Sequence, residues 1–312
     1  MDRIIFSVFT PTYNREKTLP FVYKSLLKQS FQSFEWIVID DGSTDKTEAL
    51  IQKYKEEAPF SIKYYKQENS GKHIAQNKAV DLAEGELFVP LYSDDTITED
   101  ALSEFWNAWN TIPKSERMHF SGVSCHCMDQ YGNRIGTAWP QDQFVSNDLE
   151  VTFKYHVNGE KWGMIRVDIM RKFKNANVKG HFLDESTVWF RIAKEYQKLY
   201  IDKCLRIYEI GQDSVQKRTR ESELRNAESK LYANLIYANE FYDWYLKYDL
   251  KGLVKRSLKI VYYASLMEKH ILFRNGIIRE VDHTLCKLIV CVASPYSLLN
   301  KLKKGNRSKS DR

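Results

Sequence analysis

Four short apolar runs alternate with segments of helical periodicity in the first part of the chain, and this order is the strongest constraint on the fold. The apolar runs are Ile4–Phe9, Phe34–Ile39, Ser61–Tyr65 and Leu87–Leu91. The segments between them, which predict helices, are Lys17–Ser30, Lys46–Glu57 and Ile74–Ala83. Strands that alternate with helices form a mostly parallel sheet with right-handed crossovers. We therefore predict an α/β fold in which helices flank a mostly parallel sheet.

Polar residues follow three of these strands at the point where each strand ends. They are Pro11–Asn14, Asp40–Asp41 and Ser93–Asp95. Because the carboxyl ends of parallel strands meet at one edge of a sheet, where such folds bind ligands, we expect the three clusters to converge. Adjacent carboxylates repel each other unless a cation compensates them, and Mg²⁺ is held by one or two carboxylates with substrate phosphates. The sequence thus indicates a metal–diphosphate site at Asp94 and Asp95, with a solvated helix-capping turn as the alternative.

Several classes of protein find no support in the sequence. No Gly-x-Gly-x-x-Gly follows the first strand and no Gly-x-x-x-x-Gly-Lys-Ser/Thr occurs, which argues against a nicotinamide-binding protein and a P-loop NTPase. The N-terminus is not a signal peptide and the five cysteines form no disulfide framework, so a cytoplasmic location is expected. The apolar segment Leu285–Leu299 is interrupted by Lys287 and Pro295 and is shorter than the ~20 residues of a transmembrane helix.

The section that follows the fourth strand is less regular. Met118–Met128 and Gly136–Trp139 predict two strands joined by a turn at Asp129–Asn133. Cys125 and Cys127 fall within the first of these strands. Because no second Cys/His group stands at metal spacing, we interpret this pair as residues on a strand and not as a zinc site.

Charge is distributed unevenly along the chain, whose net charge is +6. Residues 246–312 hold 15 Lys and Arg against 5 Asp and Glu, so the remainder is mildly acidic. Basic segments bind phosphates on anionic lipids, nucleic acids or lipid-linked diphosphates. Since no basic–aromatic groove motif accompanies this tail, we expect no nucleic acid partner. We predict instead that Leu285–Leu299, together with the basic residues that follow it, forms an interfacial anchor at the inner face of the cytoplasmic membrane. These basic residues, which would contact anionic lipid, are Lys301, Lys303, Lys304, Arg307 and Lys309.

A set of short motifs occurs in one order along the first part of the chain. They are Pro11-Thr-Tyr-Asn, Trp36-Ile-Val-Ile-Asp-Asp-Gly-Ser-Thr-Asp, Asn69-Ser-Gly-Lys, Asn77-Lys-Ala, Ala83-Glu-Gly-Glu and Tyr92-Ser-Asp-Asp. With these motifs, residues 4–112 resemble the nucleotide-sugar-binding half of family 2 glycosyltransferases, the inverting group with the GT-A fold. The resemblance extends, more weakly, over residues 4–215. It implies a GT-A fold and a nucleotide-sugar donor.

The resemblance implies nucleotide-binding roles for the residues after the first two strands. Pro11 and Tyr13 would flank the base, and Asn14 belongs to the same nucleotide-binding turn. Asp41 would accept a hydrogen bond from the imide N–H of the base, which suits uracil. Asp40 would lie nearby and support the turn or the ribose.

The later motifs would bind the diphosphate. Lys72 would approach the phosphates, and Asp94 and Asp95 would place a divalent cation, Mn²⁺ or Mg²⁺, that bridges them. The resemblance implies that Asp94 contacts the nucleotide as well as the cation. The chain departs from the family's Asp-x-Asp motif at its first position, which is Ser93 here.

A second carboxylate pair, Asp184-Glu185, directly precedes a predicted helix that runs to Tyr196. Acidic residues at a helix N-terminus are stabilised by its dipole, which is the structural alternative to a catalytic role. In the family this place holds a Glu-Asp pair whose second acid is the catalytic base. The order is reversed here, so the resemblance assigns the base to Glu185, with Asp184 as the alternative.

The remainder of the chain is predicted to be a loop followed by helices. Gln212–Arg218 resembles the loop that closes over the nucleotide in such enzymes, and Lys217 and Arg218 would contact the diphosphate unless they form a plain basic surface. The predicted helices are Glu221–Leu246, Leu250–Phe273 and Gly276–Leu299. Their aromatic face would pack against the catalytic domain or form a homo-oligomer.

These observations predict a GT-A domain at residues 1–215, with a nucleotide-sugar-binding half (1–112) and an acceptor half (113–215), and a helical extension with a basic tail at residues 216–312. The predicted activity is metal-dependent, inverting transfer of a hexosyl or N-acetylhexosaminyl group. The sugar would pass from a nucleoside diphosphate sugar, a UDP-sugar by the resemblance, to a hydroxyl of a glycan or lipid-linked acceptor in bacterial cell-surface polysaccharide biosynthesis. The alternative is a non-catalytic nucleotide-sugar-binding module of the same fold.

Overall fold

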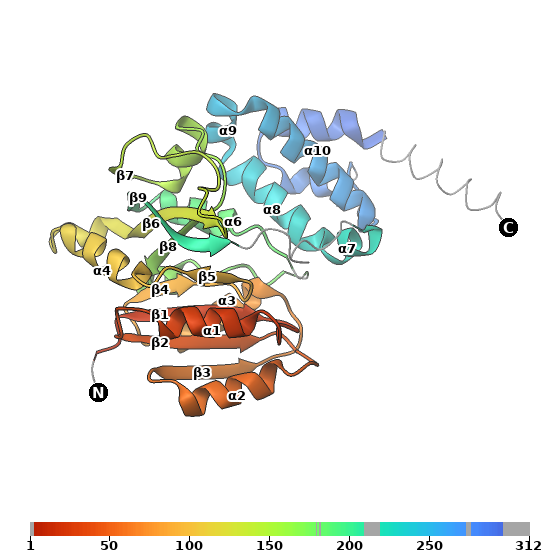
Figure 1. The fold of residues 1–312 in the computed structure, drawn as a ribbon. Coiled ribbons are helices and arrows are strands. Elements are labelled where there is room, and N and C mark those ends of the chain that lie inside the picture. The colour runs from red at the N-terminus through yellow and green to blue at the C-terminus, as the bar shows by residue number, and fades with distance from the viewer. Residues whose placement is uncertain (1–2, 179, 181, 209–218, 273–275, 296–312) are drawn as a thin grey trace. The chain divides into compact units, whose positions relative to one another are not determined.

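The computed structural model describes residues 3–178, 180, 182–208, 219–272 and 276–295 of the 312-residue chain. They belong to two compact units. The first unit comprises Met1–Ala176 with Val188–Gln216, and the second comprises Asn177–Thr187 with Lys217–Arg312. The chain therefore leaves the first unit, returns to it, and ends in the second (Figure 1).

The first unit is built on one sheet with the strand order β3-β2-β1-β4-β8-β6-β9-β5, in which β7 also pairs with β9 (Figure 1). The strands are β1 (Phe6–Thr12), β2 (Phe34–Asp40), β3 (Ser61–Lys66), β4 (Leu87–Pro90), β5 (Asp95–Ile97), β6 (Phe120–Asp129), β7 (Gln143–Ser146), β8 (Lys161–Arg166) and β9 (Gln197–Tyr208). β1 pairs in parallel with β2 and β4, and β2 pairs in parallel with β3. The four strands predicted first along the chain therefore form the predicted parallel half of the sheet.

The other half of the sheet is mixed. β8 runs antiparallel to β4 and β6, whereas β9 is parallel to β6 and antiparallel to β5 and β7. The strand predicted at Met118–Met128 is confirmed as β6, but the prediction of a strand at Gly136–Trp139 is wrong. Trp139 is buried there: its ring stacks on His126 at a centroid distance of 4.1 Å and its Nε1–H donates to Ile201 O at 2.8 Å. These contacts hold the segment as a loop, and β7 forms the strand instead.

Helices cover both faces of this sheet. They are α1 (Leu19–Leu27), α2 (Thr47–Glu57), α3 (Lys72–Leu82), α4 (Ala101–Thr111), α5 (Val167–Lys172) and α6 (Ser186–Ala193), with a 3₁₀ turn at Arg117–His119 and a π-helical turn at Glu150–Lys154. The α1, α2 and α3 helices lie at or close to the ranges that their periodicity predicts.

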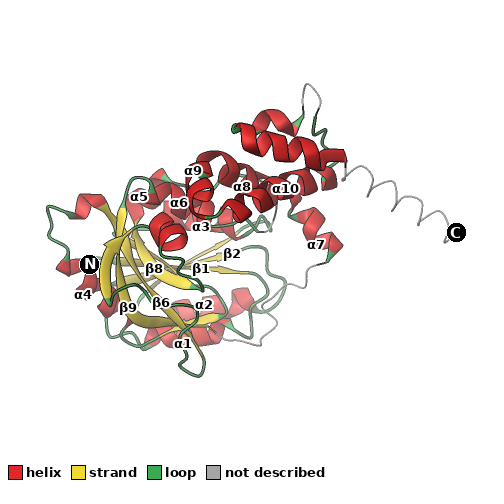
Figure 2. Cartoon of the chain, turned by 90° about the horizontal axis from the view of Figure 1, so that it is seen from above, coloured by secondary structure: helices red, strands yellow, loops and turns green. Residues whose placement is uncertain are grey.

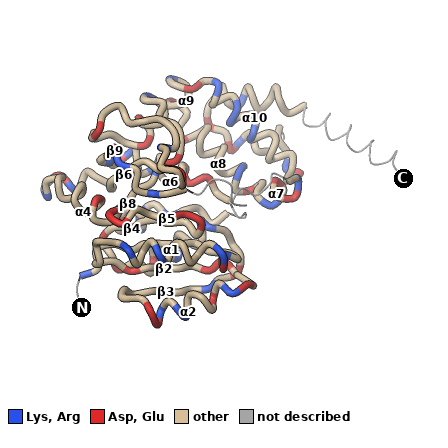
Figure 3. Tube along the Cα trace, in the orientation of Figure 1, with Lys and Arg blue, Asp and Glu red and all other residues tan. Residues whose placement is uncertain are grey.

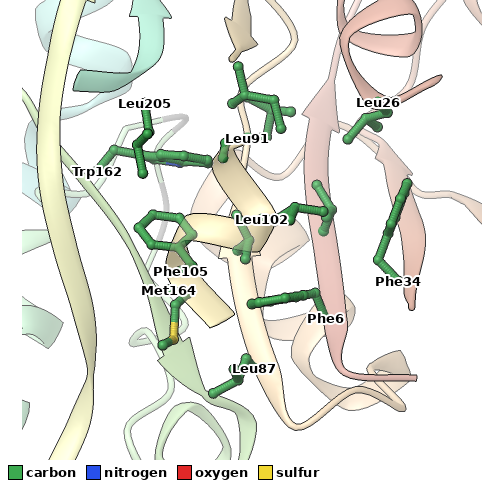
Figure 4. Packing of buried hydrophobic residues seen from close by; sticks show 14 of the residues in the cluster. Phe6, Leu26, Phe34, Leu87, Leu91, Leu102, Phe105, Trp162, Met164 and Leu205 are labelled. Carbon is green, nitrogen blue, oxygen red and sulfur yellow. The ribbon is translucent and has the colours of Figure 1, made fainter. Parts of the chain in front are cut away.

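The alternation of side chains along the strands divides the core into two layers. Phe6 of β1 faces the layer that contains α1 and α4, where Phe105 packs against Trp162 with ring centroids 4.9 Å apart (Figure 4). Phe9 points to the opposite layer, with α3 and α5. Because both faces of the strands are buried, β1 and β2 read as continuous apolar runs, as parallel strands in α/β proteins do.

The second unit is helical. Its helices are α7 (Arg220–Arg225), α8 (Ala227–Glu240), α9 (Tyr242–Tyr248) and α10 (Leu250–Leu266), followed by a 3₁₀ turn at Ile277–Glu280 and a helical stretch over residues 284–295. Figure 2 shows α8 and α10 side by side, and residues of the two helices are in contact. The helix predicted at Glu221–Leu246 is interrupted at Asn226 and again at Phe241, so three helices replace it.

Two N-terminal caps define where helices of this unit begin. Thr219 caps α7, because its Oγ1 accepts from the backbone N–H of Ser222 while Ser222 Oγ accepts from Thr219 N–H. Asp249 caps α10 through the N–H of Gly252, which donates to Oδ1 at 2.8 Å. Among the described residues, no helix is both long enough and apolar enough to cross a membrane.

Candidate functional site

The loops that follow β1, β2, β3 and β4 lie at one edge of the sheet because these strands are parallel. The backbone N–H of Asp41 donates to Thr12 O at 2.8 Å, so the first two strand ends are joined. Arg15, in the loop after β1, forms an ion pair with Asp94, with 3.6 Å between Nη2 and Oδ2. The structure therefore brings together the three polar clusters that follow β1, β2 and β4.

Asn14 joins the loop after β1 to the loop after β2. Its backbone N–H donates to Ser43 Oγ at 2.9 Å, and its side-chain Oδ1 accepts from Thr44 N–H at 2.8 Å. Asn14 has a φ of 52°, in the left-handed region that Asn tolerates better than most residues. The side chain of Asn14 thus supports the shape of the predicted nucleotide-binding turn.

Asp40 is buried and has a partner for each carboxylate oxygen. Oδ1 accepts from Ser43 N–H at 2.7 Å, and Oδ2 accepts from the Tyr64 hydroxyl at 2.7 Å. Burial of the Tyr64 hydroxyl, and then its hydrogen bond to Asp40, raise the pKa of Tyr64. Asp40 therefore shapes the turn after β2 and joins it to β3.

Asp41 holds the loop that follows β3. Its Oδ1 accepts from Ser70 N–H and from Gln67 Nε2, and its Oδ2 accepts from Gly71 N–H, each at 2.8 Å. A carboxylate offers about four acceptor positions, so three are occupied here and one is left for a ligand. Asp41 thus has a structural role in addition to the base contact that the sequence predicts.

The acid pair that follows β4, Asp94 and Asp95, has a different environment. Asp95 is only 2% exposed, and burial raises its pKa to about 7 even though the charge of Arg206 opposes this shift. Arg206 Nη1 lies 3.5 Å from Asp95 Oδ2, and its Nη2 lies 3.1 Å from Glu160 Oε2. Within the described part of the chain, Asp95 Oδ2 has no hydrogen bond. The Asp95 carboxylate is thus a buried acceptor whose charge is balanced at a distance.

Lys72 begins α3, directly after Gly71, whose φ is 96°. Its Nζ lies 4.8 Å from the ring centroid of Tyr92. Its charge also reaches Asp95, where it opposes the rise in pKa that burial causes. Lys72 therefore places a cation beside the acid pair, as the resemblance implies for a diphosphate contact.

Asp94 and Asp95 fit a divalent cation whose coordination is completed by a ligand. Within the described ranges, no group of three or more His, Cys, Asp or Glu side chains could hold a metal ion by itself. Mg²⁺ retains waters and is typically bound through one or two carboxylates together with substrate phosphates, so two acids suffice for such a site. The buried Asp95 Oδ2 without a hydrogen bond is the atom that fits this role.

Pro11 and Tyr13 occupy the end of β1 and the start of its loop. Pro11 pairs with Ile39 in the register of β1 and β2. The Tyr13 side chain is 48% exposed and leaves an aromatic face accessible at the same edge as Asp41. An exposed aromatic ring at this place can stack on a nucleobase.

Two of the motifs build the scaffold around this edge. Asn77 of α3 accepts from Asn175 N–H at 2.9 Å and donates from Nδ2 to Asn175 O at 2.9 Å. The turn after α3 is held by Glu35, whose Oε1 accepts from Glu84 N–H at 2.7 Å while Oε2 pairs with Lys63 Nζ at 2.7 Å. These polar side chains give the two motifs a role in local structure.

The pair Asp184-Glu185 belongs to the second unit. Asp184 Oδ1 accepts from Ser186 N–H at 3.2 Å, at the start of α6. Burial and then the negative charge of Asp184 raise the pKa of Tyr237, whose ring lies 4.0 Å from the guanidinium carbon of Arg256. Asp184 therefore takes part in a charged cluster of the helical extension. Lys217 and Arg218, the predicted diphosphate contacts, lie outside the described residues.

Arg206, Glu160 and Arg15 are the charged residues of this edge that sequence reasoning missed. Arg206 stands between the apolar residues Leu205 and Ile207 of β9, and a charged residue flanked in this way is the signal that could have identified it. Its partner could not be inferred, because the pairing of Asp95 with Tyr208 joins strands that are far apart in sequence.

Comparison with known proteins gives consistent results. The chain matches the family described as “Glycosyl transferase family 2” over residues 7–173. It is 28% identical over 312 residues, which cover 96% of each chain, to the GalNAc(5)-diNAcBac-PP-undecaprenol beta-1,3-glucosyltransferase of Campylobacter jejuni subsp. jejuni. It is 35% identical over 270 residues, 85% of this chain and 96% of the relative, to an uncharacterized glycosyltransferase of Haemophilus influenzae.

Solved structures share the fold. S. aureus TarS 1-349 in complex with UDP-GlcNAc has a TM-score of 0.53 at 20% identity, covering 89% of this chain and 82% of that one. The mannosyltransferase PcManGT from Pyrobaculum calidifontis, in complex with GDP-Man and Mn²⁺, has a TM-score of 0.53 at 16% identity, covering 94% and 80%. At these identities the likeness supports the fold, and it confirms the predicted GT-A class.

Proposed function

Because this chain belongs to glycosyl transferase family 2 and is related to enzymes of bacterial cell-surface glycan synthesis, we propose that it transfers a sugar from a UDP-sugar to a hydroxyl group with inversion. The observation that carries the proposal is the meeting of Asp41, Lys72, Asp94 and Asp95 at one edge of the sheet. Together they offer an acceptor for a base, a cation for phosphates and two carboxylates for a metal ion.

The donor would lie along this edge with its base at the loop after β1. Tyr13 and Pro11 would flank the base, and the remaining acceptor position of Asp41 would take its imide N–H. Lys72 would contact the diphosphate. A UDP-sugar is the donor we propose because a carboxylate is complementary to the uracil imide and because the similar fold of TarS binds UDP-GlcNAc.

Asp94 and Asp95 would hold Mn²⁺ or Mg²⁺ together with the diphosphate. When bound, the cation would stabilise the negative charge of the departing nucleotide. Arg206 would not contact the metal ion. Its positive charge stabilises the deprotonated carboxylate of Asp95, which is buried. Removal of the metal with a chelator should therefore abolish transfer without unfolding the protein.

Glu185 would act as the general base. It would remove the proton from the acceptor hydroxyl as the oxygen attacks the anomeric carbon and the bond to the diphosphate breaks. Support comes from its position, because Glu185 directly precedes α6 and is the second acid of the pair that the resemblance singles out. Asp184, the alternative, accepts from Ser186 N–H through Oδ1. Lys217 and Arg218 stay predicted diphosphate contacts.

The acceptor we propose is a glycan or lipid-linked saccharide handled at the cytoplasmic face of the membrane. The Campylobacter jejuni relative is named for an acceptor that carries undecaprenyl diphosphate. A homo-oligomer through the C-terminal helices and a membrane contact through the basic tail stay predictions, and residues 296–312 of that tail lie outside the described residues.

The base assignment is tested by Glu185→Gln. Transfer should fall ~10²–10⁴-fold, because the acceptor hydroxyl loses its proton acceptor. Thermal stabilisation by UDP with Mn²⁺ should persist in this variant, because the donor contacts remain. Glu195→Gln, an acid exposed near the other end of the same helix, serves as the matched control and should transfer normally. Normal transfer by Glu185→Gln would show that the base is another residue.

The alternative is a non-catalytic nucleotide-sugar-binding module, to which Ser93 and the Asp-Glu order lend support. A thermal-shift panel of UDP- and GDP-sugars, each with and without Mn²⁺, tests binding, since a ligand at 100 times its Kd stabilises by about 2.7 kcal/mol. A measurement of slow hydrolysis of the same nucleotide sugars distinguishes the enzyme from the non-catalytic module. Metal-dependent stabilisation with hydrolysis supports the enzyme, and stabilisation without hydrolysis or transfer supports the module.

A further inference from the structure

Helix α10 has a row of apolar side chains that the rest of the described chain covers only in part. Leu250, Val254, Leu258 and Tyr262 follow one another at intervals of four residues, and they are 37–52% exposed. The opposite side of the helix is buried against the rest of its unit, including α8. The buried residues are Leu253, Ser257, Ile260, Val261, Tyr263 and Ala264. The exposed row is therefore additional to the face that stabilises the fold.

A second row, of lysines, runs beside the apolar row. Lys251, Lys255 and Lys259 each follow one residue after an exposed apolar side chain. Successive residues of an α-helix are rotated by about 100°, so the lysines lie along one flank of the apolar row. The helix contains no Asp or Glu between Leu250 and Leu266, and its basic residues are visible along the α10 tube in Figure 3. The whole outer side of α10 thus combines apolar groups with positive charge.

We propose that this outer side of α10 binds the headgroup region of an anionic lipid membrane. An amphipathic helix with an apolar row and flanking lysines lies in the interface, with apolar side chains below the headgroups and lysines among the lipid phosphates. A second copy of the chain is a poorer partner, because pairing two such rows would bring lysines of both copies together. Tyr262 suits the boundary as well, because its hydroxyl is polar and contacts Glu223 while its ring is apolar.

This surface does not depend on the proposed transfer reaction. If the acceptor is lipid-linked, this surface would hold the enzyme at the membrane, where such acceptors are found. Lipid binding and donor turnover are nevertheless separate measurements. A failure of one leaves the other result in place.

The test is co-sedimentation of the full chain with phosphatidylcholine vesicles, with and without phosphatidylglycerol. The wild-type chain should sediment with the anionic vesicles and should be released by high salt. Val254→Ser/Leu258→Ser should lower the partition coefficient at least tenfold. Lys251→Gln/Lys255→Gln should lower it about five-fold for each lysine, and only for vesicles that contain phosphatidylglycerol.

Matched controls lie in the first unit. Met118→Ser removes an apolar side chain that is more exposed (65%) than Val254 or Leu258, and Lys24→Gln/Lys53→Gln removes two exposed lysines; both variants should bind as the wild type does. Circular dichroism melts verify that each variant is folded. Undiminished binding by the folded Val254→Ser/Leu258→Ser variant would overturn the proposal. A wild type that fails to sediment with the anionic vesicles would overturn it as well. Conversion of a dimer into a monomer by this variant in light scattering would then show that α10 binds a second copy.

Discussion

The Asp40–Asp41 carboxylates accept five hydrogen bonds from described residues, whereas Asp95, which is equally buried, has one oxygen without any. Both acid pairs follow parallel strands and lie at the same edge of the sheet. The difference is the kind of neighbour: three backbone N–H groups and two side chains donate to the first pair, whereas Asp95 lies among the charges of Arg206, Lys72, Asp94 and Glu160. The first pair therefore builds loops, and the second keeps a strong acceptor available for a cation.

The largest expected effect is a loss of stability on removal of Arg206, whose positive charge balances the buried Asp95. Arg206→Met would leave Asp95 and Glu160 without their shared partner, and a buried charge without a partner costs about 3–5 kcal/mol. Urea denaturation should show this loss, and Asp95→Asn in the same chain should recover part of it. Lys203→Met, which breaks the exposed pair with Glu104, should cost less than about 1 kcal/mol. Equal losses for both variants would mean that Arg206 does not balance the pair.

Asp95→Asn alone should separate activity from stability. We expect donor turnover to fall by on the order of 10²–10³, the usual loss when one group that stabilises transition-state charge is removed. The free energy of unfolding should fall by less than in Arg206→Met, because Arg206 retains its pair with Glu160 after Asp95 is neutralised. Assays of hydrolysis with Mn²⁺ and a urea titration give both values. Retained turnover would show that Asp95 is not a metal ligand.

Asp41→Asn should lower both the stability of the protein and its affinity for UDP. The amide would present N–H groups to one of the three donors that Asp41 now accepts from, and a buried unmatched donor costs about 1–3 kcal/mol. We expect a destabilisation of roughly 2 kcal/mol, seen in urea, together with weaker UDP binding in calorimetry. Unchanged stability would mean that the loop after β3 does not depend on this carboxylate.

Tyr64→Phe should have the smallest effect of the series. It removes only the hydroxyl that donates to Asp40, a bond of 2.7 Å whose net contribution is about 1 kcal/mol. Thermal melts should show a small loss of stability with UDP affinity unchanged, because Asp40 retains its bond from Ser43. A loss of affinity as large as that of Asp41→Asn would mean that Asp40 itself contacts the nucleotide.

Much of the parallel half of the sheet could be predicted from the sequence, because its determinants are local. The apolar runs at Phe34–Ile39 and Leu87–Leu91 mark strands, and the acids that follow them are placed at one edge by the parallel arrangement alone. The place of Asp41 and Asp95 at this edge of the sheet could therefore be predicted from the sequence.

The rest depends on contacts between distant residues. The ion pair of Asp95 with Arg206 follows from the register of β5 against β9, which no local pattern specifies. Gly136–Trp139 has the composition of a strand, but the contacts of Trp139 with His126 and Ile201 O keep it as a loop. Likewise, the apolar periodicity of Glu221–Leu246 continues through Phe241, where the backbone turns between α8 and α9.

The three hydrogen bonds that Asp41 accepts have a consequence for how such a protein could diversify. The same carboxylate closes the turn that precedes α3 and faces the edge where we place the base. A substitution of Asp41 that changed the specificity for the nucleobase would also break the hydrogen bonds of the turn that precedes Lys72. A change of donor would therefore have to arrive through neighbouring positions, or together with a new anchor for Ser70 and Gly71.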